Sequence, residues 1–202
     1  GFLEDEVYAE LRSAKHASFA ASPVRRASHA GAAYPADANL LAEGLRGMLA
    51  AGRSPAQRDG TLAGIAAPHV SFEGGHRCYG AAYGALADGL QDRTFVILGT
   101  SHYGPSEKFG LTRKPFETPF GTAAAAVDLA AELAAAAPDG AVMEDYHHSI
   151  EHSVEFQVLL LQHLFGPQVR ILPVLCGAFA RSIYEGGMPE DDPGVAAFLS
   201  AL

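Results

Sequence analysis

The stretch Thr94–Ser101, which reads TFVILGTS, decides the fold of this chain. Its apolar residues are continuous rather than alternating, which is typical of a parallel strand covered on both faces. Two further short apolar runs, 62–68 (LAGIAAP) and 169–177 (VRILPVLCG), are also predicted to be buried strands. Segments with helical patterns separate these strands, which favours an α/β fold: an αβα sandwich around a largely parallel or mixed sheet.

Helices and turns are expected between the predicted strands. A helix that begins at Asp37 or Asn39 should end near Gly52. The segment 149–165 (SIEHSVEFQVLLLQHLF) predicts a strongly amphipathic helix with Ser149 as its N-cap. Further helices are expected over 3–20, 79–90 and 125–137, and the segment 109–121 should be extended and hairpin-like.

The composition argues against several functional classes. With 202 residues, of which 49% are hydrophobic and 18% charged, the chain has the size and character of one globular domain. Its formal net charge of −9 argues against nucleic-acid binding, because a phosphate backbone would be repelled. We find neither a secretory signal nor an apolar run long enough to span a membrane. The two cysteines fit a reducing cytoplasm, where we expect the protein to reside.

The pattern divides the chain into two parts. Residues 1–24 are predicted to form an N-terminal helical extension, and residues 25–202 the α/β domain. The chain begins without methionine and ends in VAAFLSAL (195–202), which has the pattern of a helix interior. We therefore expect a fragment of a longer protein, whose α/β domain is incomplete at its C-terminal end.

Histidines follow two of the predicted strands. His69 ends the first strand in AAPHVSF (66–72), and His102 ends the second in LGTSHYG (98–104). Ligands of open α/β sheets gather at the carboxyl ends of the strands, so the two imidazoles could converge on one metal ion or one substrate. Each could instead cap its strand by hydrogen bonding to the backbone. Cys176, at the end of the third strand, is expected to pack as a small apolar residue.

The residues 148–152 read HSIEH and match the H-x-x-E-H pattern of inverted zinc peptidases. With Ser149 as the N-cap, His148 lies before the helix, so it cannot share a helical face with His152 and zinc peptidase chemistry is disfavoured. Glu151 and His152 fall in the first turn, where the helix dipole favours a neutral imidazole that can bind a metal or a substrate. These two are the candidate catalytic residues. The alternative is a capping turn with a solvated polar stripe.

Six segments together resemble one family, the MEMO-like proteins, also called AmmeMemoRadiSam system protein B. They occur in the family's order: 26–37 (RASHAGAAYPAD), 65–75 (IAAPHVSFEGG), 95–105 (FVILGTSHYGP), 111–121 (LTRKPFETPFG), 151–157 (EHSVEFQ) and 171–177 (ILPVLCG). The resemblance implies a fold like that of class III extradiol dioxygenases, with a metal site at one end of the sheet. It implies that His69 and His102 are metal ligands. Glu151 and His152 match the family's Glu-His-Ser motif near the pocket.

The resemblance also implies iron or copper as the cofactor, and partner proteins from a radical-SAM system. The chain departs from the family's pattern in two places. Where the family commonly has Pro-His-Ala-Gly-Tyr, this chain has PHVSF (68–72). The family's later Ser-Asp-x-x-His segment, and the later Cys-Gly segment that supplies a third ligand, do not occur before Leu202, and Cys176 belongs to a different motif. We therefore expect residues 1–202 to lack a complete three-ligand site, and the site of this fragment to be metal-free.

The favoured interpretation is a cytoplasmic, non-haem metal-binding protein, in which His69 and His102 hold iron or copper and a redox activity is still to be assigned. The first alternative is a ring-cleaving extradiol dioxygenase, with His152 or a downstream histidine as the base. The second is a module that binds a peptide or another protein and does no chemistry. In each case the ligand, whether a small molecule or a peptide, is not identified by the residues.

Overall fold

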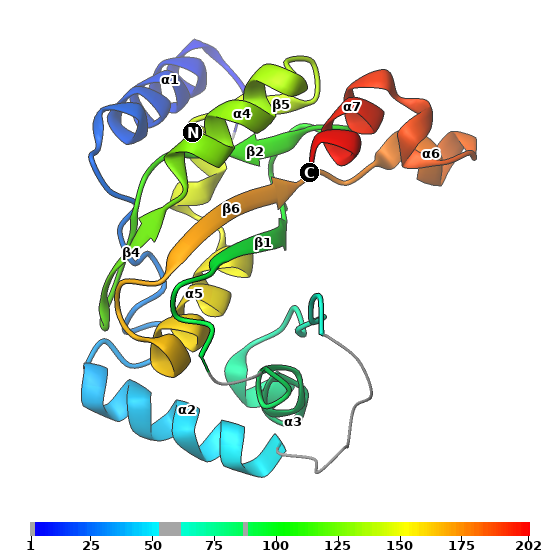
Figure 1. The fold of residues 1–202 in the computed structure, drawn as a ribbon. Helices are drawn as coiled ribbons and strands as arrows, with labels where there is room; N and C mark the ends of the chain where they lie inside the picture. The colour runs from blue at the N-terminus through cyan, green and yellow to red at the C-terminus, as the bar shows by residue number, and fades with distance from the viewer. Residues whose placement is uncertain (1–2, 53–61, 87–88) are drawn as a thin grey trace.

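A computed structural model describes residues 3–52, 62–86 and 89–202 of the chain (Figure 1). The strands that it contains form one mixed sheet: β1 (Thr94–Thr100), β2 (Phe109–Leu111), β3 (Phe116–Thr118), β4 (Gly121–Ala125), β5 (Ala141–Met143) and β6 (Arg170–Cys176). The longer helices are α1 (Glu6–Ala21), α2 (Ala38–Gly52), α3 (Phe72–Tyr83), α4 (Val127–Ala136) and α5 (His152–Phe165). Shorter ones are η1 (Tyr146–Ser149), α6 (Ala180–Glu185), η2 (Pro189–Asp191) and α7 (Pro193–Ala201).

Strand β6 is the centre of the sheet. Along one side it pairs in parallel with the whole of β1, from Thr94 opposite Arg170 to Thr100 opposite Cys176. Along its other side it pairs in parallel with β4 near its start and antiparallel with β2 near its end. Strand β5 continues the sheet beside β2, and β3 forms an antiparallel hairpin with β4. The hairpin confirms the extended structure predicted for 109–121.

Helices cover both faces of this sheet, which confirms the predicted αβα sandwich. On one face α5 packs against β1 and β6, and α2 and α3 pack outside it, as Figure 1 shows. On the other face α4 and α7 bury Leu172 and Val174 of β6 together with Phe109 of β2. Both faces of β6 are buried, as its continuous apolar sequence predicted.

Strand β1 differs from β6 in one respect that the sequence did not predict. Ile97 faces the α5 layer and is buried, whereas Val96 and Leu98 are about half exposed on the opposite face. Helices α4 and α7 reach β6 and β2 but leave this face of β1 open. The prediction that Thr94–Ser101 is covered on both faces is therefore wrong for one of them, although the strand itself is confirmed.

Glycine at position 99 allows the close packing of β1 on α5. A Cβ atom built on Gly99 would lie 2.7 Å from Cγ2 of Val154 and 2.8 Å from Oγ of Ser153. Both distances are shorter than van der Waals contact, so the first turn of α5 can rest on the end of β1 only where no side chain intervenes. This contact places the N-terminus of α5 beside the residues that follow β1.

Three predicted elements need correction. Residues 62–68 form no strand, because the run contains Ile65 as its one β-branched residue and is otherwise leucine, alanine, glycine and proline, a composition with low strand propensity. The helix predicted over 79–90 lies at Phe72–Tyr83, where the Ser71 side chain caps it by accepting from the amide of Gly74. Residues 87–88 lie outside the described part. The third correction concerns the start of α5.

Helix α5 begins at His152 rather than at Ile150, and Ser149 is not its N-cap. The preceding residues Tyr146–Ser149 form the separate turn η1, in which the Asp145 side chain accepts from the backbone amide of His147. Glu151 is extended, with φ −75° and ψ 135°, and occupies the N-cap position. The prediction that His148 precedes the helix is confirmed, and Glu151 and His152 are at its very start.

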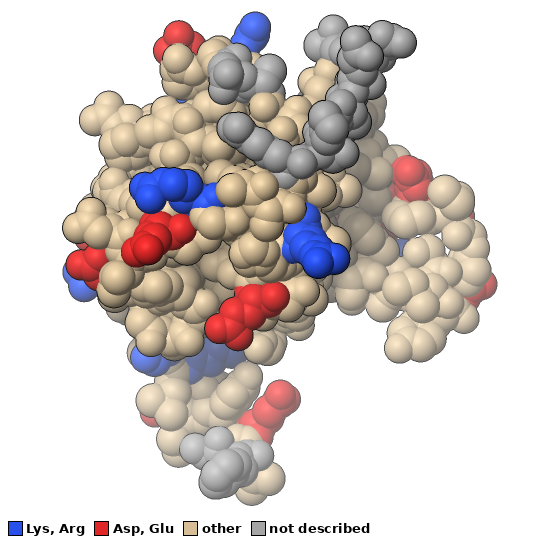
Figure 2. Space-filling view, turned by 90° about the horizontal axis from the view of Figure 1, so that it is seen from below, with Lys and Arg blue, Asp and Glu red and all other residues tan. Residues whose placement is uncertain are grey.

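Among residues 3–52, 62–86 and 89–202, no helix combines the length and the apolar character that crossing a membrane requires. Figure 2 views the molecule from the end at which α2 and α3 lie in Figure 1, and on this face basic and acidic side chains are interspersed among uncharged ones.

Candidate metal centre

Three imidazoles converge at the end of β1. One side-chain nitrogen from each of His69, His102 and His152 lies within 4.8 Å of the other two. The Nε2 atoms of His69 and His102 are 3.0 Å apart. The ring centroids are separated by 4.8 Å for His69 and His102, 4.8 Å for His69 and His152, and 5.1 Å for His102 and His152. His69 and His102 are exposed and His152 is half-buried, so the cluster opens to solvent.

Each imidazole comes from a different element. His102 follows β1, whose end is held by a hydrogen bond from the amide of Ser101 to the carbonyl of Cys176, 2.9 Å long. His152 is the first residue of α5, which rests on Gly99 of β1. His69 lies in the loop before α3, where the Tyr79 hydroxyl donates to the carbonyl of Val70 over 2.9 Å. The two histidines predicted at strand ends therefore meet, although His69 follows a loop and not a strand.

Glu151 orients one of the three imidazoles. Its side chain is 2% exposed, and its two carboxylate oxygens accept from the backbone amide of His102 at 2.6 Å and from Nδ1 of the same residue at 2.7 Å. Because a carboxylate only accepts, Nδ1 carries the proton and the lone pair is at Nε2, which faces His69. A carboxylate that holds the second nitrogen of a ligand histidine is the usual arrangement at metal sites.

Burial and neighbouring charge favour the metal-binding form of His152. Partial burial lowers the pKa of His152, and the adjacent His69 and His102 lower it further, since a second or third positive charge at one place is disfavoured. The neutral imidazole is the form that ligates a metal.

His148 takes no part in the cluster. It is fully buried beside Phe116, and its Nε2 donates to the carbonyl of Gly110 over 3.0 Å. Burial lowers the pKa of His148 to about 4, so it is neutral near pH 7. The H-x-x-E-H pattern thus spans two residues of the site, Glu151 and His152, and one residue of the core.

Cys176 also lies outside the cluster. It is the last residue of β6, is half-buried and packs against the layer formed by α4 and α7. Burial raises the pKa of its thiol to about 11, so near pH 7 the thiol is protonated. The prediction that Cys176 packs as a small apolar residue is confirmed.

A family model described as Memo-like protein matches residues 25–185 of this chain. The chain belongs to the Memo-like family. It is 34% identical to a MEMO1 family protein of Methanopyrus kandleri over 155 residues, which cover 72% of this chain and 53% of that protein. It is also 34% identical to one of Pyrococcus furiosus over 178 residues, 80% of this chain and 59% of that protein. For a relative from Aquifex aeolicus the identity is 28% over 151 residues, with 75% and 39% covered.

This Memo-like chain spans about half the length of the curated relatives that it matches. The three clustered histidines and Glu151 all lie in the matched part, 25–185, whereas α1 precedes it. The sequence led us to expect that residues 1–202 cannot assemble three ligands, because a downstream cysteine was required. The structure corrects this expectation: His152, predicted as a catalytic residue, provides a third candidate nitrogen.

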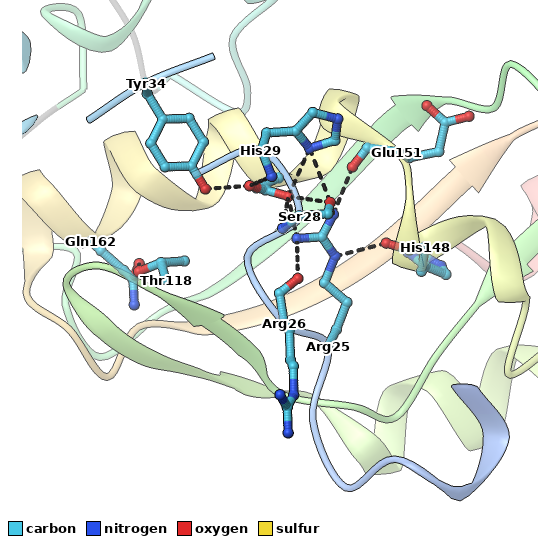
Figure 3. A network of polar contacts seen from close by, with 10 residues as sticks. Arg25, Arg26, Ser28, His29, Tyr34, Thr118, His148, Glu151 and Gln162 are labelled. Atoms are coloured by element: carbon cyan, nitrogen blue, oxygen red, sulfur yellow. Dashed lines mark hydrogen bonds and ion pairs between the residues drawn. The ribbon is translucent and has the colours of Figure 1, made fainter. Parts of the chain in front are cut away.

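Sequence reasoning missed the polar network behind the Memo-like site. Buried Glu155 of α5 contacts Arg25, Ser28, His29 and Tyr34 of the N-terminal part. Figure 3 labels these four partners within the network. His29 also packs its ring edge-on against His152, with centroids 5.9 Å apart. The segments 26–37 and 151–157 had each been singled out, but nothing in one sequence indicates that they pair.

Proposed function

We propose that this Memo-like chain is a non-haem metal-binding protein in which His69, His102 and His152 hold one transition-metal ion, iron or copper. The convergence of the three nitrogens carries this proposal. Two ligands that lie about 2 Å from a shared ion, at angles between a right angle and the tetrahedral angle, are themselves roughly 3 Å apart. The 3.0 Å between Nε2 of His69 and Nε2 of His102 fits such a pair.

The chemistry of the donors supports the same proposal. Imidazole nitrogens suit iron, copper, zinc and nickel, whereas magnesium and calcium prefer oxygen ligands. Glu151 keeps His102 in the tautomer that presents Nε2, and burial lowers the pKa of His152, which favours its neutral form. Three ligands leave coordination positions open on the exposed side of His69 and His102. Iron or copper held in this way would supply redox chemistry toward oxygen or an organic ligand at those open positions.

The alternative of a ring-cleaving dioxygenase has weaker support. Its iron is held by two histidines and one carboxylate. Glu151, which contacts the cluster, uses both carboxylate oxygens to accept from His102, so it orients that imidazole and does not face the ion position as a ligand. The alternative of a binding module without chemistry does not account for the spacing of the three nitrogens. Two cavities of about 260 Å³, one beside α1 and η1 and one beside α6 and η2, are lined by other residues.

Metal analysis of the purified chain tests the proposal. Wild-type protein should bind about one iron or copper ion, and His69→Ala, His102→Ala and His152→Ala should each weaken binding by at least about 100-fold, since each removes a ligand. His163→Ala is the matched control, because His163 lies on α5 near Phe120, away from the cluster. The proposal is wrong if the wild type binds no metal, or if the three variants retain the wild-type content.

The location and partners remain predictions. We propose a cytoplasmic protein, as its two cysteines suggest, that works with proteins of a radical-SAM system, as the sequence resemblance implies. Co-purification of a tagged chain from its own cell extract, with His69→Ala/His102→Ala as the comparison, would show whether such partners bind and whether the site is needed. Recovery of no protein carrying a radical-SAM cluster would contradict this part of the proposal.

A further inference from the structure

Arg25 is a buried cation whose donors all have partners. Its side chain is fully buried and forms an ion pair with Glu155. Its Nε donates to the carbonyl of His148 over 2.7 Å, and Nη2 donates to the carbonyl of Glu151 over 2.8 Å (Figure 3). The guanidinium thus holds the backbone at both ends of the turn that leads into α5. Its planar fork allows these contacts at the same time, which a lysine cannot reproduce.

Glu155 fixes Arg25 from the other side. Its carboxylate is fully buried one turn into α5 and accepts from Oγ of Ser28 at 3.0 Å, from Nδ1 of His29 at 3.0 Å and from the hydroxyl of Tyr34. Burial alone would raise the pKa of Glu155, but the Arg25 charge and the Tyr34 and His29 hydrogen bonds outweigh it and lower the pKa to about 2. Glu155 is therefore ionised in the folded protein.

We propose that Arg25 and Glu155 are positioning residues of the three-histidine site, which they build by fixing the turn that carries Glu151 and His152. This inference rests on the proposed metal-binding function. The two residues touch no ligand nitrogen. They act through Glu151, whose carbonyl Arg25 holds and whose carboxylate holds His102. The buried guanidinium of Arg25 therefore sets the positions of two of the three imidazoles, those of His102 and His152, relative to β1.

If Arg25 and Glu155 only stabilised the fold, their replacement would change the stability and leave the geometry of the three histidines unchanged. Replacing a buried ion pair by apolar residues of similar size is often neutral or stabilising, whereas removing one partner is strongly destabilising. The double variant Arg25→Met/Glu155→Leu removes both buried charges together, so it should be more stable than either single replacement, although it loses the contacts to the carbonyls of His148 and Glu151. Arg25→Lys should retain the charge beside Glu155 but lose the fork. In both variants the geometry of the site is measured on folded protein, separately from the thermal midpoint.

Cobalt binding by the full chain tests this inference, because Co²⁺ reports its ligand geometry by visible absorption. Both variants should bind Co²⁺ about 10- to 100-fold more weakly, the range for residues that orient ligands, and the absorption bands should change. The control is Gln162→Leu, since Gln162 is also buried on α5 and accepts from Thr118 Oγ1 at 2.6 Å, at the helix end far from the site in sequence. It should lower the thermal midpoint and leave Co²⁺ binding unchanged.

Nuclear magnetic resonance of ¹⁵N-labelled imidazoles gives a second test without metal. In wild-type protein His102 should be fixed with its proton on Nδ1, because Glu151 accepts from that atom. In both variants it should change to a mixture of tautomers, whereas Gln162→Leu should match the wild type. If the wild type binds no Co²⁺, the proposed function fails, and the tautomer result alone decides the positioning role. Unchanged Co²⁺ affinity or an unchanged His102 tautomer in folded variants would overturn the inference.

Discussion

Replacement of Gly99 by alanine should destabilise the protein and also disturb the proposed metal site. The new Cβ would lie 2.7 Å from Cγ2 of Val154 and 2.8 Å from Oγ of Ser153, roughly 1 Å inside normal contact. Neither atom can move alone, because Val154 is buried and Oγ of Ser153 donates to the carbonyl of Thr100 over 2.8 Å. The start of α5 must therefore shift away from β1.

Forcing an extra methyl group into a packed core typically costs about 1 to 3 kcal/mol, which for a domain of this size lowers the thermal midpoint by about 2 to 12 °C. Circular dichroism melts measure this effect, with Gly47→Ala as the control. Gly47 is in α2 and a Cβ built there meets nothing within 4 Å, so alanine should stabilise the helix by about 1 kcal/mol. Because His152 precedes Ser153, metal affinity should fall as well. A Gly99→Ala protein with the wild-type midpoint would refute the close packing of β1 on α5.

Three further outcomes are expected. Glu151→Gln should weaken metal binding about 10- to 100-fold by calorimetric titration, because an amide cannot accept with both atoms from His102, whereas Glu144→Gln, away from the site, should not. The pKa of His148 is lowered from 6.5 to about 4, so the stability that neutral His148 contributes is full above pH 6.5 and is lost as the pH falls toward 4. Urea midpoints of His148→Gln should therefore fall less between pH 7 and pH 4.5 than those of the wild type, and parallel slopes would contradict this. Iron or copper at a free concentration of about 100 times the dissociation constant should stabilise the fold by about 2.7 kcal/mol, a gain that a chelator reverses in thermal melts.

The sheet and its helices could be predicted where a segment carries a strong local signal. The run 169–177 became β6, which is buried on both faces, and 94–101 became β1. The prediction failed for 62–68 because an apolar run with little β-branching can pack against a core without joining a sheet. It failed for the exposed face of β1 because the extent of a covering layer depends on where distant helices pack, which the strand's own residues do not encode.

The site could be located in part. His69 and His102 were chosen because each ends a predicted strand, and they meet, although the first strand does not exist. His152 was chosen for its helix start, and the same position brings its nitrogen within reach of the other two. Arg25 and Glu155 are separated by 130 residues, and no spacing rule relates residues so far apart in the chain. Their pairing is a product of the tertiary fold.

The H-x-x-E-H pattern lies at the candidate site, but its two histidines do not have the geometry of a zinc peptidase. Its two histidines would share one metal only on a continuous helix, where residues four positions apart lie on one face. Here η1 ends at Ser149 and α5 begins at His152, so the chain changes direction between them. His148 turns into the core toward Gly110, and His152 turns toward β1. Because the helix is interrupted between Ser149 and His152, Glu151 is an extended N-cap residue. From that position its carboxylate accepts from both the backbone amide and Nδ1 of His102.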